Sequence, residues 1–217
     1  MKASLWASMF FLLLGGVAMA QQPSFPMATN SIATNSPGQL AEIRSKAEKG
    51  DAAAQLCLGW QYASGGGVKL DLTEAITWFR KAADQGYAVA QTSLGLCYAS
   101  GYGVPLDYVE AIKWFRKAAD QAEVNAENAL GLSYANGRGV PNDDVEAVKW
   151  YRRAAEQNDR QAQLNLGLCY DNGKGVTQDY VEAMKWYRKA AEQGVEDAQS
   201  NLGRMYAFGH GVPKDEA

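Results

Sequence analysis

The sequence predicts an all-α fold, a right-handed α-solenoid of stacked antiparallel helix pairs. Two observations lead to this prediction. The chain repeats itself every 36 residues, and within each repeat the apolar residues recur at helical spacing. Because two antiparallel helices cannot bury both of their faces alone, neighbouring pairs must stack on one another, and such stacking produces a solenoid.

The period is clearest in the tryptophans, since Trp78, Trp114, Trp150 and Trp186 each follow the previous one by 36 residues. A Leu-Gly pair, a tyrosine and a Gly-x-Gly-Val loop recur in the same register, starting from Leu58, Tyr62 and Gly65. We therefore divide this part of the chain into four full repeats and a fifth that stops early: 45–80, 81–116, 117–152, 153–188 and 189–217.

The second helix of each repeat is predicted from an apolar stripe and from its ends. In the first repeat the stripe consists of Ala75, Trp78, Phe79, Ala82 and Ala83, which lie at i, i+3, i+4, i+7 and i+8. An aspartate followed three residues later by glutamate has the spacing of a capping box and marks the start of the helix four times. These pairs are Asp71 and Glu74, Asp107 and Glu110, Asp143 and Glu146, and Asp179 and Glu182.

Residues that tolerate a positive φ are expected where the second helices end. They are Gly50, Gly86, Asn158 and Gly194. Ala122 occupies the same position in the third repeat and departs from this rule.

The first helix of each repeat is predicted from Ala54, Leu58 and Tyr62, at i, i+4 and i+8, with Gly59 small enough to let a neighbouring helix approach. The following Gly-x-Gly-Val segment is predicted to be a turn. A phosphate-binding loop would need a preceding strand and free amides at the next helix N-terminus, whereas here a helix precedes and an aspartate caps those amides. We therefore expect no nucleotide cofactor.

The first 20 residues have the pattern of a secretory signal peptide: Lys2, an apolar run from Leu5 to Val17, and a small-x-small ending at Ala20. We expect cleavage after Ala20 and an exported chain. A membrane anchor is the alternative, but the apolar run is shorter than the roughly 20 residues that a spanning helix needs. No membrane span is expected after signal removal, and residues 21–36 are expected to form a flexible leader.

The two ends of the solenoid are expected to differ. Residues 37–49 are predicted to form an N-terminal capping helix, in which Glu42 stands where the tryptophan of a repeat belongs. The fifth repeat stops at the threshold of its second helix, so Leu202 and Tyr206 lack the partner that covers their equivalents. Either the sequence is truncated here, or a partner or a second copy completes the stack; self-association through this uncapped repeat is one of these expectations.

Composition limits the kinds of partner. The chain has 217 residues, 47% of them hydrophobic, and a net charge of −3, so it can build a sizeable core. It carries no basic run, and nucleic acid is therefore not expected as a partner.

Three motifs recur in register: Ala-Gln-x-x-Leu-Gly-x-x-Tyr, Gly-x-Gly-Val-Pro-x-Asp, and Glu-Ala-x-Lys-Trp-Phe/Tyr-Arg-Lys-Ala-Ala-x-x-Gly. Over residues 45–217 they resemble the repeat of the Sel-one-like repeat (SLR) proteins, which have tetratricopeptide-like (TPR-like) helical solenoids. The resemblance implies a scaffold or adaptor for protein–protein interaction, in the bacterial periplasm or outside the cell. It implies no reaction and no cofactor.

Some SLR relatives that carry disulfide bridges are labelled β-lactamases, so hydrolysis is the alternative function. The resemblance places their paired cysteines where this chain has alanines such as Ala83 and Ala90. The three cysteines present, Cys57, Cys97 and Cys169, lie in predicted first helices. Cys97 and Cys169 are equivalent positions two repeats apart, about 18 Å at a helix spacing of about 9 Å, which is too far for a disulfide.

The sequence contains no recognisable catalytic or metal-binding arrangement. No serine has a lysine three residues later, as a penicillin-binding type of acyl-transfer site would need. The single histidine, His210, lies at a variable loop position and is expected to be an exposed turn residue. We therefore expect no catalytic residues, no bound metal and no enzymatic activity.

The residues that differ between repeats indicate where a partner binds. A helical wheel places four positions of each first helix, Ala53, Leu56, Trp60 and Ala63 in the first repeat, opposite the core, on the face that lines the concave groove of TPR-like solenoids. Two of these positions, those of Leu56 and Trp60, are compared between the repeats. These candidates are Leu56, Trp60, Thr92, Leu96, Asn128, Leu132, Leu164, Leu168, Ser200 and Arg204. Trp60, Leu96, Leu132 and Leu168 would form an apolar strip for a protein or peptide partner. The alternative is that these side chains pack against the adjacent first helix.

Overall fold

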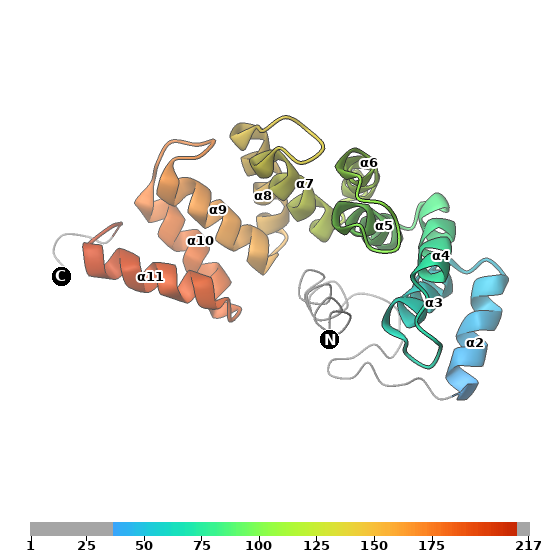
Figure 1. The fold of residues 1–217 in the computed structure, drawn as a ribbon. Helices are drawn as coiled ribbons and strands as arrows, with labels where there is room; N and C mark the ends of the chain where they lie inside the picture. Colours follow the sequence, from blue (N-terminus) through green and yellow to red (C-terminus); the bar gives the residue numbers. More distant parts are fainter. Residues whose placement is uncertain (1–36, 212–217) are drawn as a thin grey trace. The chain divides into compact units, whose positions relative to one another are not determined.

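The computed structural model describes residues 37–211, and these residues form ten α-helices without strands (Figure 1). The predicted signal peptide and leader, as well as residues 212–217, lie outside the described part. The helices follow one another as hairpin pairs, which confirms the predicted all-α solenoid fold. None of the described helices is both long and apolar enough to cross a membrane.

The chain divides into two compact units, residues 1–123 and 124–217. The helices described in unit 1 are α2 (Pro37–Glu48), α3 (Ala52–Ser64), α4 (Leu72–Asp84), α5 (Ala88–Ser100) and α6 (Tyr108–Ala119). Those of unit 2 are α7 (Val124–Asn136), α8 (Asp144–Glu156), α9 (Arg160–Asn172), α10 (Tyr180–Glu192) and α11 (Glu196–Phe208). Within each unit, every helix packs on the helix that precedes it and on the helix that follows it.

The second helices begin at their predicted aspartates. The Asp71 carboxylate accepts a hydrogen bond of 3.0 Å from the Glu74 backbone N–H, and the other three pairs make the same bond. The glutamate does not complete the expected capping box. In three repeats its carboxylate instead accepts the indole N–H of the tryptophan one turn later, as Glu74 does from Trp78 at 2.8 Å. The motif therefore fixes the tryptophan as well as the helix start.

The glycine of the Leu-Gly pair lets the two helices of a repeat come together. A Cβ added at Gly59 would lie 2.6 Å from the ring of Phe79, which is closer than atoms can approach. The same slot is filled by an aromatic ring at Gly95, Gly131 and Gly167. At Gly203, in α11, no described atom lies within 4 Å. The predicted close approach is thus confirmed in four repeats.

Left-handed residues end the second helices as the sequence indicates. Gly50, Gly86 and Gly194 have positive φ angles, and so does Asn158 at 69°. Ala122 adopts the same conformation, with φ at 58°, although its Cβ makes this region unfavourable. The geometry of the repeat therefore imposes a conformation at Ala122 that the side chain does not favour.

The N-terminal helix α2 covers α3 with its apolar side and presents a polar side to solvent. Ala47 is buried and packs with Ala54 and Leu58. On the outer side, the Glu42 carboxylate and the Lys46 ammonium form an exposed ion pair of 2.7 Å. Glu42 has the position of a repeat tryptophan, so a charged pair replaces the apolar contact there.

Candidate functional site

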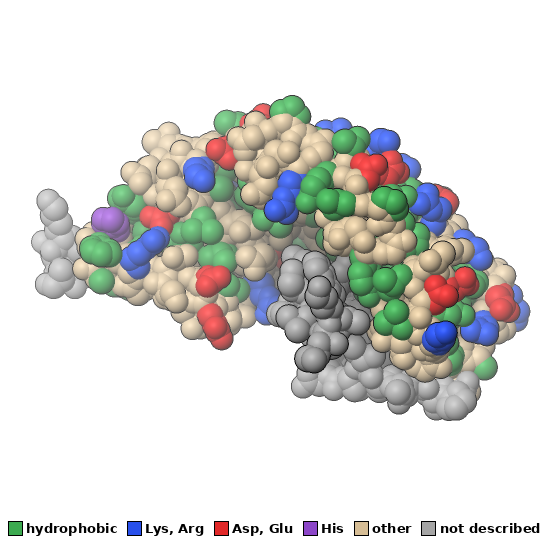
Figure 2. All heavy atoms as spheres, in the orientation of Figure 1, with side chains coloured by type: hydrophobic (Ala, Val, Ile, Leu, Met, Phe, Trp, Pro, Cys, Tyr) green, Lys and Arg blue, Asp and Glu red, His purple; other side chains and the backbone are tan. Residues whose placement is uncertain are grey.

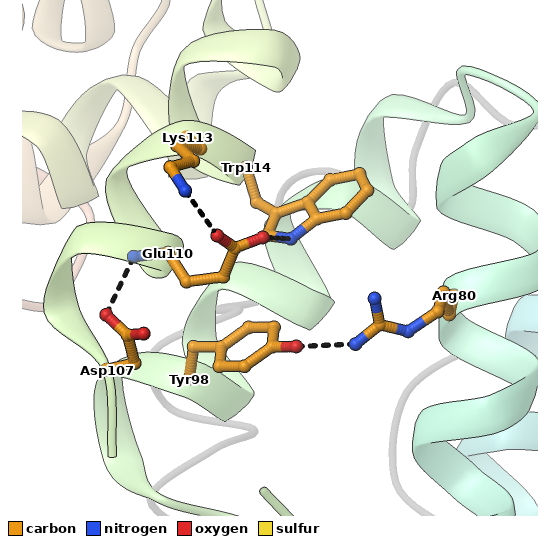
Figure 3. A network of polar contacts seen from close by, with 6 residues as sticks. All are labelled: Arg80, Tyr98, Asp107, Glu110, Lys113 and Trp114. Atoms are coloured by element: carbon orange, nitrogen blue, oxygen red, sulfur yellow. Dashed lines mark hydrogen bonds and ion pairs between the residues drawn. The ribbon is translucent and has the colours of Figure 1, made fainter. Parts of the chain in front are cut away.

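The side chains that recur in every repeat form a structural network (Figure 3). Figure 3 shows Glu110, which accepts the Trp114 indole N–H at 3.0 Å while its second oxygen pairs with Lys113 at 2.8 Å. Nearby, the Arg80 guanidinium of α4 donates a 2.5 Å hydrogen bond to the Tyr98 hydroxyl of α5. This bond joins one repeat to the next.

The Arg–Tyr bond recurs between neighbouring repeats. The same bond joins Arg44 to Tyr62, Arg152 to Tyr170 and Arg188 to Tyr206. A glutamine pair adds a second link, since Gln85 donates to the Gln55 side-chain oxygen at 2.7 Å while Gln55 donates to the Ala47 carbonyl. The shared residues therefore hold the stack together, and a function specific to this chain must depend on residues that the repeats do not share.

The ten candidate residues fall into three groups. Four of them are buried, contrary to the prediction that they face a groove: Leu56, Thr92, Asn128 and Leu164. Four are half-buried: Trp60, Leu96, Leu132 and Leu168. Two are exposed: Ser200 and Arg204. The helical wheel gives the direction of a side chain but not the position of the neighbouring helix, and that helix covers the first group.

The four half-buried side chains agree in part with both predictions, a surface for a partner and packing against neighbouring helices. Trp60 packs its ring against Phe79, edge to face, with the ring centroids 5.1 Å apart. Leu96 contacts the same hydrophobic cluster, whereas Leu132 and Leu168 contact two clusters of unit 2. Each side chain keeps part of its surface exposed. We call Trp60 and Leu96 the first-helix surface of unit 1, and Leu132 and Leu168 the first-helix surface of unit 2.

The first helices of unit 1 carry no charged side chain, because α3 and α5 contain no Asp, Glu, Lys, Arg or His. Their serine hydroxyls bond to their own helix: Ser64 donates to the Trp60 carbonyl at 2.8 Å and Ser100 to the Leu96 carbonyl at 2.7 Å. Charged side chains instead lie on the second helices, and Figure 2 shows Lys and Arg along the edge of this unit. The first-helix surface of unit 1 is therefore neutral and poor in free hydrogen-bond donors.

Unit 1 also contains a buried polar pair that sequence reasoning missed. The Thr92 hydroxyl, which is fully buried, donates a 2.5 Å hydrogen bond to the Glu123 carboxylate. Glu123 is 9% exposed and follows the strained Ala122. Thr92 was a candidate for partner binding, but its hydroxyl is used inside the protein.

Unit 2 differs from unit 1 because its first helices contain charged residues. Glu127 replaces the repeat glutamine in α7. Its carboxylate accepts a 2.8 Å hydrogen bond from the Gln157 amide and forms a 2.8 Å ion pair with the Arg153 guanidinium. Asn128, another buried candidate, accepts a 3.2 Å hydrogen bond from the Asn165 amide. Asn128 thus makes a polar contact at a position that is leucine, threonine or serine elsewhere, and Glu127 brings a charge to a position that is otherwise glutamine.

The most distinctive group of unit 2 consists of Asp171, Tyr187 and Arg204. The buried Asp171 carboxylate accepts a hydrogen bond of 3.2 Å from the Tyr187 hydroxyl. The same oxygen pairs with the Arg204 guanidinium at 2.5 Å. Burial raises the pKa of Tyr187, and the nearby Asp171 carboxylate raises it further, so the phenol stays protonated as a donor. The sequence signal was available, since the equivalents of Asp171 are all alanine.

The other residues singled out by the sequence do not form a reactive site. The three cysteines are free thiols, and burial raises the pKa of Cys97 to about 12 and that of Cys169 to about 11. His210 is half-buried rather than exposed, because its ring stacks on Tyr180 at a centroid distance of 4.2 Å. Within residues 37–211, no group of three His, Cys, Asp or Glu side chains could hold a metal ion.

Known proteins share both the repeat and the fold. The family model described as Sel1 repeat matches residues 50–87, 88–123, 124–159, 160–195 and 196–217. These matches begin five to seven residues later than the repeats defined above, since the first residue of a repeat is a convention. A secretory immunoglobulin A-binding protein from Escherichia coli, EsiB, is 48% identical over 42 residues, which cover 19% of this chain and 9% of that protein.

Solved structures extend the similarity to most of the chain. A protective antigen of uropathogenic Escherichia coli with an SLR fold is 48% identical, has a TM-score of 0.78 and is matched over 80% of this chain. The chain covers 37% of that antigen. A Sel1 repeat protein from Oxalobacter formigenes is 39% identical, with a TM-score of 0.75 and coverage of 83% of this chain and 74% of that one. Cysteine-rich protein B from Helicobacter pylori is 32% identical, with a TM-score of 0.50 and coverage of 64% and 99%.

The repeated network, the stacked helix pairs and these matches agree with one another. The chain belongs to the Sel1 repeat, or SLR, family.

Proposed function

We propose that this chain is an exported scaffold that binds a protein or peptide through the first-helix surfaces of its two units. One observation carries the proposal. The side chains shared by all repeats bond to one another within the stack, whereas the half-buried Trp60, Leu96, Leu132 and Leu168 remain partly open to solvent. Apolar side chains that stay accessible on a rigid helical scaffold are typical of a protein-binding surface.

The relatives support a binding role. EsiB is named as a protein that binds secretory immunoglobulin A, and the structurally similar Escherichia coli protein is described as a protective antigen. A secreted host protein is therefore a reasonable first partner to test. Export is supported by the signal-peptide pattern of residues 1–20, and detection of the protein cleaved after Ala20 in a periplasmic or extracellular fraction would test it.

A double substitution tests the binding surface directly. Leu132→Asp with Leu168→Asp should keep the helical circular dichroism spectrum and abolish capture of partners from the exported fraction. Its matched control is Val145→Asp with Val181→Asp on the second helices, where both valines are more than half exposed. The control should keep both the fold and the capture. Equal capture by both double variants would refute the proposed surface, and unfolding of the first would mean that these leucines are core residues.

We propose binding rather than catalysis. Within residues 37–211 no group of three His, Cys, Asp or Glu side chains could hold a metal ion, and burial raises the pKa of the Cys97 thiol, which therefore stays protonated. The purified protein should therefore not hydrolyse nitrocefin. Turnover above the rate of a heat-denatured sample would instead support the β-lactamase alternative.

A further inference from the structure

Two positions of unit 2 depart from the repeat pattern together. Asp171 stands where the other repeats have Ala63, Ala99, Ala135 and Ala207. Arg204 stands where they have Trp60, Leu96, Leu132 and Leu168. The two residues are 33 positions apart, yet their side chains form an ion pair. A charged pair thus occupies a place where every other repeat is apolar.

The pair is asymmetric in its exposure. The Asp171 side chain is 9% exposed, whereas that of Arg204 is 51% exposed. Asp171 also accepts the Tyr187 hydroxyl, so its charge is compensated from inside the protein. The Arg204 guanidinium is bonded to one partner in the described chain, through a single nitrogen. A guanidinium has five N–H donors, so most of its planar edge remains available on the surface.

A purely structural role does not explain the pair. Within unit 1, α5 packs on α4 with Ala63 and Leu96 at these positions, and within unit 2, α9 packs on α8 with Ala135 and Leu168, so the charged contact is not needed to dock one repeat on the next. A buried carboxylate carries a desolvation cost that an alanine would avoid. What the pair does is tie the arginine to Asp171 of α9, one helical turn after the half-buried Leu168, so that both residues lie on one side of that helix.

We propose that Arg204 binds a carboxylate of the partner, with Asp171 as the residue that positions its guanidinium. This inference rests on the proposed function, because the carboxylate would follow apolar side chains that bind at Leu132 and Leu168. The occupant is therefore a peptide segment with apolar residues and then an acidic group, either an Asp or Glu side chain or a C-terminal carboxylate. Arginine suits this ligand, since its planar fork matches the two oxygens of a carboxylate.

The test is a selection of random dodecapeptides against the full chain and against the variant Asp171→Ala with Arg204→Leu. This variant restores the pattern of the other repeats and leaves no buried charge unpaired, so its thermal unfolding should stay close to that of the parent protein. Peptides selected by the parent should be enriched in apolar residues followed by Asp or Glu. The variant should keep the apolar preference, lose the acidic one, and bind the selected acidic peptides about tenfold or more weakly.

The outcomes separate the two proposals. Acidic peptides that bind parent and variant equally, or parent-selected peptides without acidic residues, would overturn the role of Arg204 and leave the scaffold function standing. Failure of the parent to enrich any peptide would count against both. If the double variant does not fold, Arg204→Lys serves instead. It keeps the positive charge but loses the planar guanidinium, and it should weaken the binding of acidic peptides only. Synthetic peptides with a free acid or an amide at the C-terminus identify which carboxylate binds.

Discussion

The two units are built from the same repeat but differ in what their first helices present. In unit 1, α3 and α5 carry no charge, and their serines bond to their own backbone. In unit 2, Glu127 and Asp171 are buried in first helices, and the half-exposed Arg204 pairs with Asp171. The contrast shows that the shared residues are sufficient to build the stack, which leaves the first-helix positions free to vary in polarity.

The largest effect is expected where the shared scaffold itself is broken. Gly167→Ala would put a Cβ 2.6 Å from the Tyr187 ring and should destabilise the protein by about 1–3 kcal/mol, because the ring must move out of its slot. The matched control, Gly203→Ala, has no described atom within 4 Å and should be neutral or stabilising by up to about 1 kcal/mol. Urea unfolding of both variants measures the difference. Equal effects would mean that the slot does not limit the approach of the helices.

A second prediction concerns the charged pair of unit 2. Arg204→Leu alone leaves the buried Asp171 carboxylate without its cation and should cost about 3 kcal/mol, whereas Asp171→Ala alone leaves a half-exposed arginine and should cost less. The double variant should recover most of the stability. A double-mutant cycle by denaturant unfolding measures the coupling, and additive single effects would contradict the described pair.

Ala122 offers a smaller test at the end of unit 1. Ala122→Gly should stabilise the protein by about 0.5–1 kcal/mol, since glycine adopts the positive φ of 58° without a steric penalty. Gly86→Ala is the reciprocal change, at a site with φ of 85° and open space around it, and should destabilise by a similar amount. Thermal melting of the two variants provides the comparison. A destabilising Ala122→Gly substitution would show that the Cβ of Ala122 contributes more packing than strain.

The smallest effect is expected from the cysteines. Burial raises the pKa of Cys97 from 9.0 to about 12, so the native thiol stays protonated and should not react with Ellman's reagent at pH 8. Above about pH 9 the unfolded thiol ionises first, and the contribution of this group to stability therefore falls as the pH rises toward 12. Rapid labelling of Cys97 in the native protein would contradict its burial.

Much of the fold could be predicted because its signals are local or periodic. The aspartate caps, the glycine slots and the left-handed helix ends all recur in register, so each copy supports the others. The bond between Glu110 and Trp114 could not be predicted, since the spacing of a capping box also fits it. The exposure of the candidate residues was predicted less well, and their role in binding stays a prediction. A helical wheel treats one helix in isolation, so it could not show that neighbouring helices bury Leu56 and Leu164.

The pair of Asp171 and Arg204 was missed for a different reason. Arg204 was identified as a candidate because it varies among the repeats. Asp171 is equivalent to Ala63, which the wheel also places opposite the core, but only the positions equivalent to Leu56 and Trp60 were taken as candidates. Only the three-dimensional stack brings these residues together across 33 positions of sequence. A comparison of departures from the repeat pattern, taken in pairs on adjacent first helices, would have found the signal.

Site-specific photo-cross-linking tests the binding proposal most directly. A benzoylphenylalanine placed at Leu168 reports on the first-helix surface of unit 2, and one placed at Val181, which is 52% exposed, reports on the second helices. After irradiation in the exported fraction, Leu168 should yield a cross-linked protein partner and Val181 should not. Adducts from Val181 alone would contradict a binding site on the first helices.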